Sequence, residues 1–124
     1  MSWTDCMPSS QPIIRFGDII QNIESIMSYV EDHDFESFVE DRRTADAVER
    51  CLQRITEAAI KLHPEAAELL PDQDWKAMRD LGNKLRHYYD VILDEDIWTI
   101  VHDRLPNLLK DCRRAISKIE SNKP

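Results

Sequence analysis

Four stretches of the chain carry hydrophobic residues at the three-and-four spacing of an amphipathic α-helix. The first begins near Phe16 and ends near residues 31–33, and its apolar positions are Ile19, Ile20, Ile23, Ile26, Met27 and Val30. Phe35 and Phe38 follow as a short apolar pair, which predicts one helical turn packed on the core.

The second stretch lies between two helix-boundary signals. Side chains that favour an N-cap occur from Asp41 to Thr44, and Pro64 predicts that the helix ends near His63. Residues 64–73 contain two prolines and a short apolar cluster. They predict a connector that holds one short turn of helix.

The third stretch begins after Asp72 or Asp74, which are candidate caps ahead of Trp75. It is predicted to continue as a helix to about residue 92, with the apolar stripe Trp75, Met78, Leu81, Leu85, Tyr88 and Ile92. The opposite side of this helix is polar and carries Arg79, Asn83, Arg86, His87 and Asp90.

The fourth stretch begins near Asp94 or Asp96 and repeats hydrophobic residues in a heptad-like pattern as far as Ile119. Pro106 interrupts the pattern, and we expect a kink or a break there because proline lacks the backbone N–H that a helix uses. The four stretches together predict an all-α fold, an up-and-down bundle of four main helices with additional short helical turns.

Composition supports a single small domain. The 124 residues are enough to bury a core without disulfides or metals. Only 2 glycines occur, which disfavours β-rich folds and excludes Gly-rich phosphate loops. We expect one helical domain over residues 15–120, a flexible tail over residues 1–14 and a frayed end over residues 121–124.

The net charge of −8 is unevenly distributed along the chain. Residues 1–74 hold 6 basic and 16 acidic side chains, whereas residues 75–124 hold 10 basic and 8 acidic ones. An acidic protein is a poor general binder of nucleic acid, because phosphates attract cations. Any anionic ligand is therefore expected at the C-terminal part of the chain.

The cysteines suggest a reduced protein. Cys6, Cys51 and Cys112 show no CxxC spacing, and Cys51 and Cys112 lie among apolar residues, which predicts buried thiols. No secretory signal and no apolar run long enough to cross a membrane occur in the sequence. We expect a cytoplasmic protein, and the residue patterns indicate neither a metal site nor a cofactor.

The densest polar cluster lies within the third predicted helix. Arg79, Asn83, Arg86 and His87 occur together with Tyr89. Histidine transfers protons near neutral pH, and arginine binds phosphate through paired donors. Such a site could cleave RNA through its 2′-hydroxyl without a metal. The alternative is a solvated helix face with no chemical role.

Gly82 lies in the middle of the same predicted helix, where glycine costs about 1 kcal/mol relative to alanine. A close approach by a neighbouring helix or by a ligand would explain a glycine at this position. The simpler alternative is that the glycine is merely tolerated.

Several segments match a known pattern in order along residues 17–116. Residues 55–58 read Ile-Thr-Glu-Ala, residue 83 is Asn, and residues 87–89 read His-Tyr-Tyr. The chain resembles the HepT-like branch of the HEPN family, small all-α ribonuclease toxins. The family patterns are Ile-Gly-Glu-Ala and Arg-Asn-x-x-x-His-x-Tyr. Thr56 therefore replaces a glycine, and Gly82 replaces the motif arginine.

The resemblance implies a metal-independent endoribonuclease, in which His87 transfers a proton while Asn83 and either Arg79 or Arg86 hold the scissile phosphate. It also implies a homodimer, whose two motif helices line a shared cleft. The implied partner is a small nucleotidyltransferase antitoxin of the MntA type, which adds AMP to the tyrosine at position 89 and silences the toxin.

The missing motif arginine leaves two further interpretations open. The protein could be a catalytically inactive HEPN protein that serves the nucleotidyltransferase as a binding partner and AMP acceptor. It could also be a structural four-helix adaptor, in which case the polar cluster would have no shared cleft.

Overall fold

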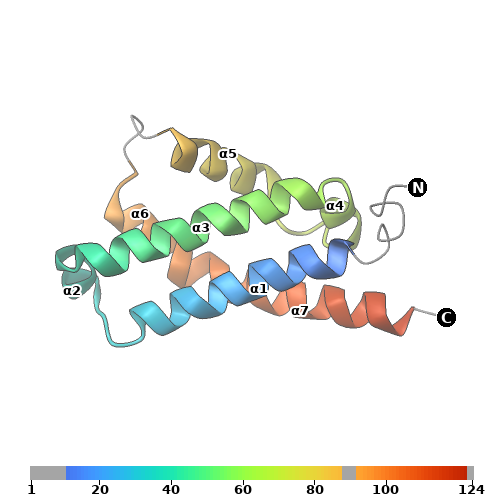
Figure 1. The fold of residues 1–124 in the computed structure, drawn as a ribbon, viewed down its shortest axis with the longest axis horizontal. Helices are drawn as coiled ribbons and strands as arrows, with labels where there is room; N and C mark the ends of the chain where they lie inside the picture. The colour runs from blue at the N-terminus through green and yellow to red at the C-terminus, as the bar shows by residue number, and fades with distance from the viewer. Residues whose placement is uncertain (1–10, 88–91, 123–124) are drawn as a thin grey trace, which may run out of the picture.

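The computed structural model describes residues 11–87 and 92–122, and every secondary-structure element within those ranges is helical. Figure 1 shows the order of the elements: α1 (Gln11–Val30), α2 (Phe35–Glu40), α3 (Arg42–Leu62), α4 (Glu65–Leu69), α5 (Trp75–Arg86), α6 (Asp94–Thr99), a π-helical segment η2 (Ile100–Arg104) and α7 (Leu105–Ser121). The predicted all-α bundle is confirmed, with α1, α3, α5 and the α6–η2–α7 run as its main members.

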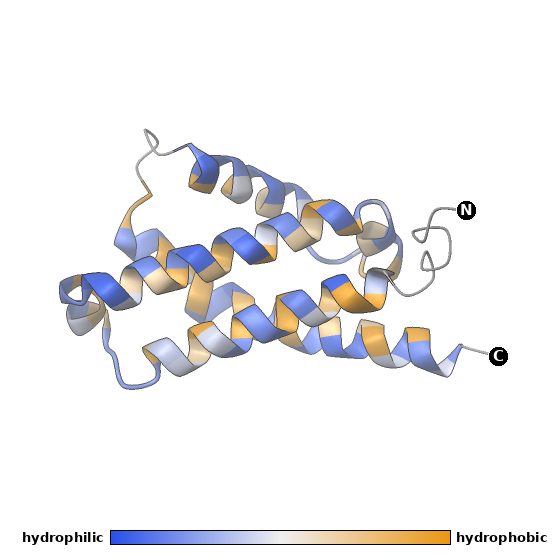
Figure 2. Cartoon of the chain, viewed as in Figure 1, coloured by the Kyte–Doolittle hydropathy of each residue, from blue (hydrophilic) through white to orange (hydrophobic). Residues whose placement is uncertain are grey.

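The long helices pack side by side around one core. Helix α1 packs along α3 and α7, and α3 lies between α1 and α5 (Figure 1). Each long helix carries apolar residues along one side and polar residues along the other (Figure 2). Side chains with no exposed surface come from α1, α2, α3, α6, η2 and α7, and the largest of them are Phe16, Ile19, Ile23, Ile26, Phe38 and Ile97.

The predicted start of α3 and α5 is confirmed by their caps. The side chain of Asp41 accepts a hydrogen bond from the backbone N–H of Thr44 at 3.2 Å, and that of Asp74 accepts one from Ala77 at 2.9 Å. These bonds satisfy N–H groups that have no partner within the helix.

Two helix boundaries differ from the prediction. Helix α1 begins at Gln11, so helical structure covers residues 11–14, which were expected to belong to a flexible tail. Helix α5 ends at Arg86, whereas the apolar stripe predicted that it would continue to Ile92. His87 has φ −100° and ψ 96°, outside the helical region. Histidine, tyrosine and valine are weak helix formers, and they follow where the helix stops.

The fourth stretch is helical throughout, and its winding changes just before the proline, where a kink or a break was predicted. Pro106 lies in the first turn of α7, and the preceding segment η2 is a widened π-helical turn. The proline has no N–H to donate to the carbonyl four residues earlier, and its ring would crowd that carbonyl. A π-helical turn accommodates this mismatch without ending the helical run.

Cys51 and Cys112 are buried free thiols, as the sequence predicted. Burial raises the pKa of both thiols, and it raises that of Cys112 to about 12, with a smaller contribution from the charge of Asp111. Cys6 lies outside the described residues. No helix within the described residues is long and apolar enough to cross a membrane.

Candidate functional site

The exposed face of α5 carries the polar cluster that the sequence singled out. Arg79, Asn83 and Arg86 are all exposed. The Arg86 guanidinium donates a hydrogen bond to the side-chain oxygen of Asn83. These two residues therefore present a guanidinium and an amide as one unit.

His87 follows directly at the C-cap of the helix. Its side chain is exposed, and its backbone N–H donates to the carbonyl of Lys84 at 3.2 Å. Asn83 and Arg86 thus lie in the last turn of α5 and His87 directly follows it, although the sequence predicted His87 within the helix. Tyr89 and Asp90 lie outside the described residues.

Arg79 stands apart from this group. It lies seven residues before Arg86 on the same helix, a separation of about 10 Å along the axis. Arg86 is therefore the arginine that the structure places beside His87, and Arg79 is placed at the opposite end of the exposed face.

Gly82 is the one residue of α5 that the structure buries. A β-carbon built on Gly82 would lie 2.8 Å from the hydroxyl oxygen of Thr56 and 2.9 Å from its β-carbon. Thr56 is 1% exposed, and its hydroxyl donates to the carbonyl of Gln53 at 2.8 Å. The expected close approach at Gly82 is confirmed, and a neighbouring helix makes it.

A buried bridge holds the segment before α5 against α7. The Gln73 amide donates to a carboxylate oxygen of Asp111 at 2.7 Å, and Arg114 pairs with the other oxygen at 3.2 Å. Asp111 is only 8% exposed, so these partners compensate for the burial of its charge. The bridge positions the start of the helix that carries the site.

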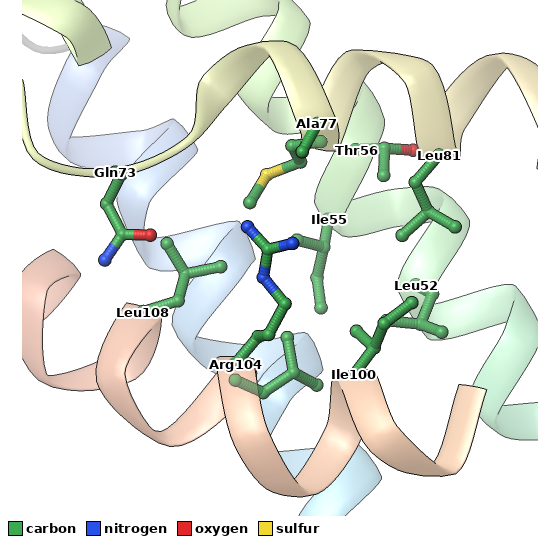
Figure 3. Close-up of a pocket in the computed structure, with 11 residues that line it drawn as sticks. Leu52, Ile55, Thr56, Gln73, Ala77, Leu81, Ile100, Arg104 and Leu108 are labelled. Atoms are coloured by element: carbon green, nitrogen blue, oxygen red, sulfur yellow. The ribbon is translucent and has the colours of Figure 1, made fainter. Parts of the chain in front are cut away.

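Arg104 is a cation near the site that sequence spacing did not reveal. Figure 3 shows its side chain extending from η2 into a small pocket of about 70 Å³ between α3, α5 and η2, with Leu52, Ile55 and Leu81 among the lining residues. A neighbouring hollow of about 340 Å³ is lined by Lys84, Asp96 and Arg104, among others. Lys84 and Arg104 meet only through the tertiary fold, because they belong to different elements.

Among the residues that the structure describes, no group of three or more His, Cys, Asp or Glu side chains is placed to hold a metal ion. The chemical groups on the α5 face are thus an imidazole, guanidinium groups and an amide. They can exchange a proton and bind a phosphate.

The model of the ribonuclease HepT-like family matches residues 19–115, a span that includes the whole of α5 and the caps on either side of it. The chain belongs to the ribonuclease HepT-like family. The match covers α3 and α5 completely and most of α1 and α7.

Several curated proteins are similar to this HepT-like chain. A Methanocaldococcus jannaschii protein named "Putative RNase MJ0127" is 37% identical over 92% of this chain and 94% of its own length. The Thermococcus cleftensis protein named "Probable ribonuclease HepT" is 32% identical over 73% of this chain and 83% of its own. No solved structure matches the chain.

Proposed function

We propose that this HepT-like protein is a metal-independent endoribonuclease whose active groups lie at the exposed end of α5. The observation that carries the proposal is the Arg86–Asn83 hydrogen bond directly beside His87. A guanidinium held by an amide is oriented to bind a phosphate, and the residue next to Arg86 in the chain supplies an imidazole that can transfer a proton.

The reaction that suits these groups is an internal transfer at phosphorus. His87 accepts the proton of the ribose 2′-hydroxyl, the 2′-oxygen forms a bond to phosphorus, and the bond from phosphorus to the 5′-oxygen breaks. The leaving 5′-oxygen takes up a proton, so that the products are a 2′,3′-cyclic phosphate and a 5′-hydroxyl. Arg86 and Asn83 stabilise the charge on the phosphoryl oxygens.

A homodimer is part of this proposal. One chain supplies a single His87, whereas the reaction removes one proton and delivers another. A twofold pairing of the α5 ends would supply an imidazole for each transfer and would double the local positive charge in an acidic protein.

The test is cleavage of RNA in the presence of EDTA. We expect the purified protein to produce fragments with 2′,3′-cyclic phosphate ends, and His87→Ala to lower the rate by about 100-fold or more. His102→Ala is the matched control, because His102 is also exposed but lies on η2. Intact RNA with the wild-type protein, or equal rates for the two histidine variants, would contradict the proposal.

We further propose that the protein acts as the toxin of a toxin–antitoxin pair and that a small nucleotidyltransferase silences it by adding AMP to Tyr89. The motif position of Tyr89, two residues after His87, supports this assignment. An adenylate there would add bulk and negative charge two residues after His87 in the chain. Mass spectrometry after incubation with such a transferase and ATP tests it, with Tyr89→Phe as the control.

The packing of Gly82 on Thr56 favours one alternative, a catalytically inactive partner of the nucleotidyltransferase. In this chain no guanidinium projects from position 82, and Thr56 fills the space beside it. This alternative predicts AMP on Tyr89 without RNA cleavage by the unmodified protein. The two assays together therefore separate the alternatives.

A further inference from the structure

A second hollow lies at the opposite end of the α5 face, between the end of α3 and the first turn of α5. Its volume is about 250 Å³, and its lining residues are Ala59, Ile60, His63, Trp75 and Arg79. We infer that this hollow binds one base and one phosphate of single-stranded RNA, as a subsite outside the reacting centre. The inference rests on the proposed ribonuclease function and assigns the substrate contact that extends it.

Trp75 supplies an aromatic surface of fixed orientation on which a base can stack. Its indole N–H donates to the carbonyl of Leu70 at 2.8 Å, and the side chain is half-buried. The hydrogen bond restrains the orientation of the ring, so little conformational freedom is lost when a base stacks on it. Stacking on aromatic side chains is the usual way in which proteins hold single-stranded RNA.

Arg79 supplies a positive charge that forms no ion pair with a carboxylate of the described residues. Among the described residues, it has no acidic partner within 4.0 Å, whereas the adjacent Asp80 pairs with Lys76 at 2.9 Å. His63 lines the same hollow and is exposed, and none of the five lining residues is acidic. In a protein of net charge −8, the Arg79 cation in a lining without acidic residues favours an anionic ligand.

The hollow and the proposed reacting centre lie on one helix. Arg79 lines the hollow, and the helix continues for about 10 Å to Arg86 beside His87. A strand whose base stacks on Trp75 would follow the α5 face toward His87 over a few nucleotides. Such a subsite would select substrates that are unpaired near the cut, because a stacked base must leave its duplex.

The test introduces either a negative or a positive charge at the rim of the hollow and leaves the residues of the reacting centre unchanged. Ile60 is 40% exposed on α3, so it tolerates either a carboxylate or an ammonium. The probe is a decauridylate with 2′-O-methyl riboses, which lacks the hydroxyl needed for cleavage. We expect Ile60→Glu to weaken binding by about tenfold and Ile60→Lys to retain or tighten it. Ile14→Glu is the matched control, since Ile14 is 44% exposed on α1.

Tryptophan fluorescence adds a second readout. Quenching by the probe should be smaller in Trp75→Phe than in the wild type, while the affinity changes little because phenylalanine still stacks. Equal binding by Ile60→Glu and Ile60→Lys, or quenching that Trp75→Phe leaves unchanged, would overturn the subsite. Absence of any binding of the probe would overturn it as well.

The proposed function and the subsite fail in different ways. Charge-dependent binding of the probe without cleavage of ordinary RNA supports the subsite and contradicts the nuclease. If ordinary RNA is cleaved and the probe binds Ile60→Glu and Ile60→Lys equally well, the nuclease is supported and the subsite is contradicted.

Discussion

Gly82 on α5 is packed so closely on Thr56 of α3 that position 82 has no room for a β-carbon. A β-carbon at residue 82 would lie 2.8 Å from the Thr56 hydroxyl oxygen, closer than such contacts normally allow. The resemblance aligns Thr56 with a glycine and Gly82 with the motif arginine. In this chain the glycine is therefore on α5 and the larger residue is on α3.

The first prediction concerns stability. Gly82→Ala should destabilise the protein by about 1–3 kcal/mol, since overpacking against the buried Thr56 outweighs the better helix propensity of alanine. Gly17→Ala is the matched control, because nothing lies within 4 Å of the β-carbon it would add. That control should raise the free energy of unfolding by up to about 1 kcal/mol. Urea denaturation measures both, and equal effects would contradict the packing.

The second prediction concerns the motif arginine. Gly82→Arg alone should unfold or distort the α3–α5 contact, because its β-carbon meets Thr56. The double variant Thr56→Gly/Gly82→Arg should keep the fold and raise RNA cleavage above the wild-type rate by about tenfold or more, through one additional phosphate contact. Circular dichroism and a cleavage assay check the two parts. If the double variant were as unstable as Gly82→Arg alone, Thr56 would not be the residue that excludes an arginine from position 82.

The third prediction separates the two arginines of the α5 face. Arg86 lies beside His87, so Arg86→Ala should mainly lower kcat, by about tenfold to 1,000-fold. Arg79 lies about 10 Å away along the helix, so Arg79→Ala should mainly raise KM. Steady-state kinetics on a short RNA gives both constants, and the reverse pattern would assign the reacting phosphate to Arg79.

The fourth prediction is a loss of stability at high pH. Burial raises the pKa of Cys112 from 9.0 to about 12, so the folded state keeps the proton that the unfolded state releases between these values. The free energy of unfolding should therefore fall as the pH rises above about 9. In Cys112→Ala this fall should be shallower, although the variant is less stable at pH 7 because it leaves a small cavity. Urea titrations from pH 7.5 to 10.5 measure the two slopes.

The fifth prediction concerns the cap of α3. Hydrogen bonds from the side chain and the backbone N–H of Thr44 lower the pKa of Asp41 below 3.8. The cap is thus fully effective above that value, and its stabilisation is lost as the pH falls through the lowered pKa. Asp41→Ala should lower the Tm at pH 7, while Asp41→Asn retains most of it because asparagine also caps. Thermal melts measure the prediction. The drop in Tm between pH 7 and pH 3 should be smaller in Asp41→Ala than in the wild type.

Helix positions followed from the sequence wherever a local signal was strong. The caps at Asp41 and Asp74 and the π-helical turn before Pro106 depend on hydrogen bonds within a few residues, and all three lie where the pattern predicted a boundary or an irregularity. The end of α5 was not predictable from the sequence. An apolar stripe indicates which side of a helix is buried, but it does not indicate whether tertiary contacts stabilise the last turns.

The sequence predicted which polar residues share the exposed face of α5, but not how they are arranged. The spacing of Arg79, Asn83 and Arg86 placed them on one face of α5. Only the structure shows which arginine bonds to Asn83 and that His87 has left the helix. The hollow at Trp75 includes His63 from another element, and no spacing rule joins residues that distant in sequence.

The sequence by itself determined the helical bundle, its charge asymmetry and the polar residues of α5, because periodicity, capping and composition act locally. The tertiary structure alone decided why position 82 is a glycine. Thr56 and Gly82 share one contact between two helices, and the space that one side chain occupies is unavailable to the other.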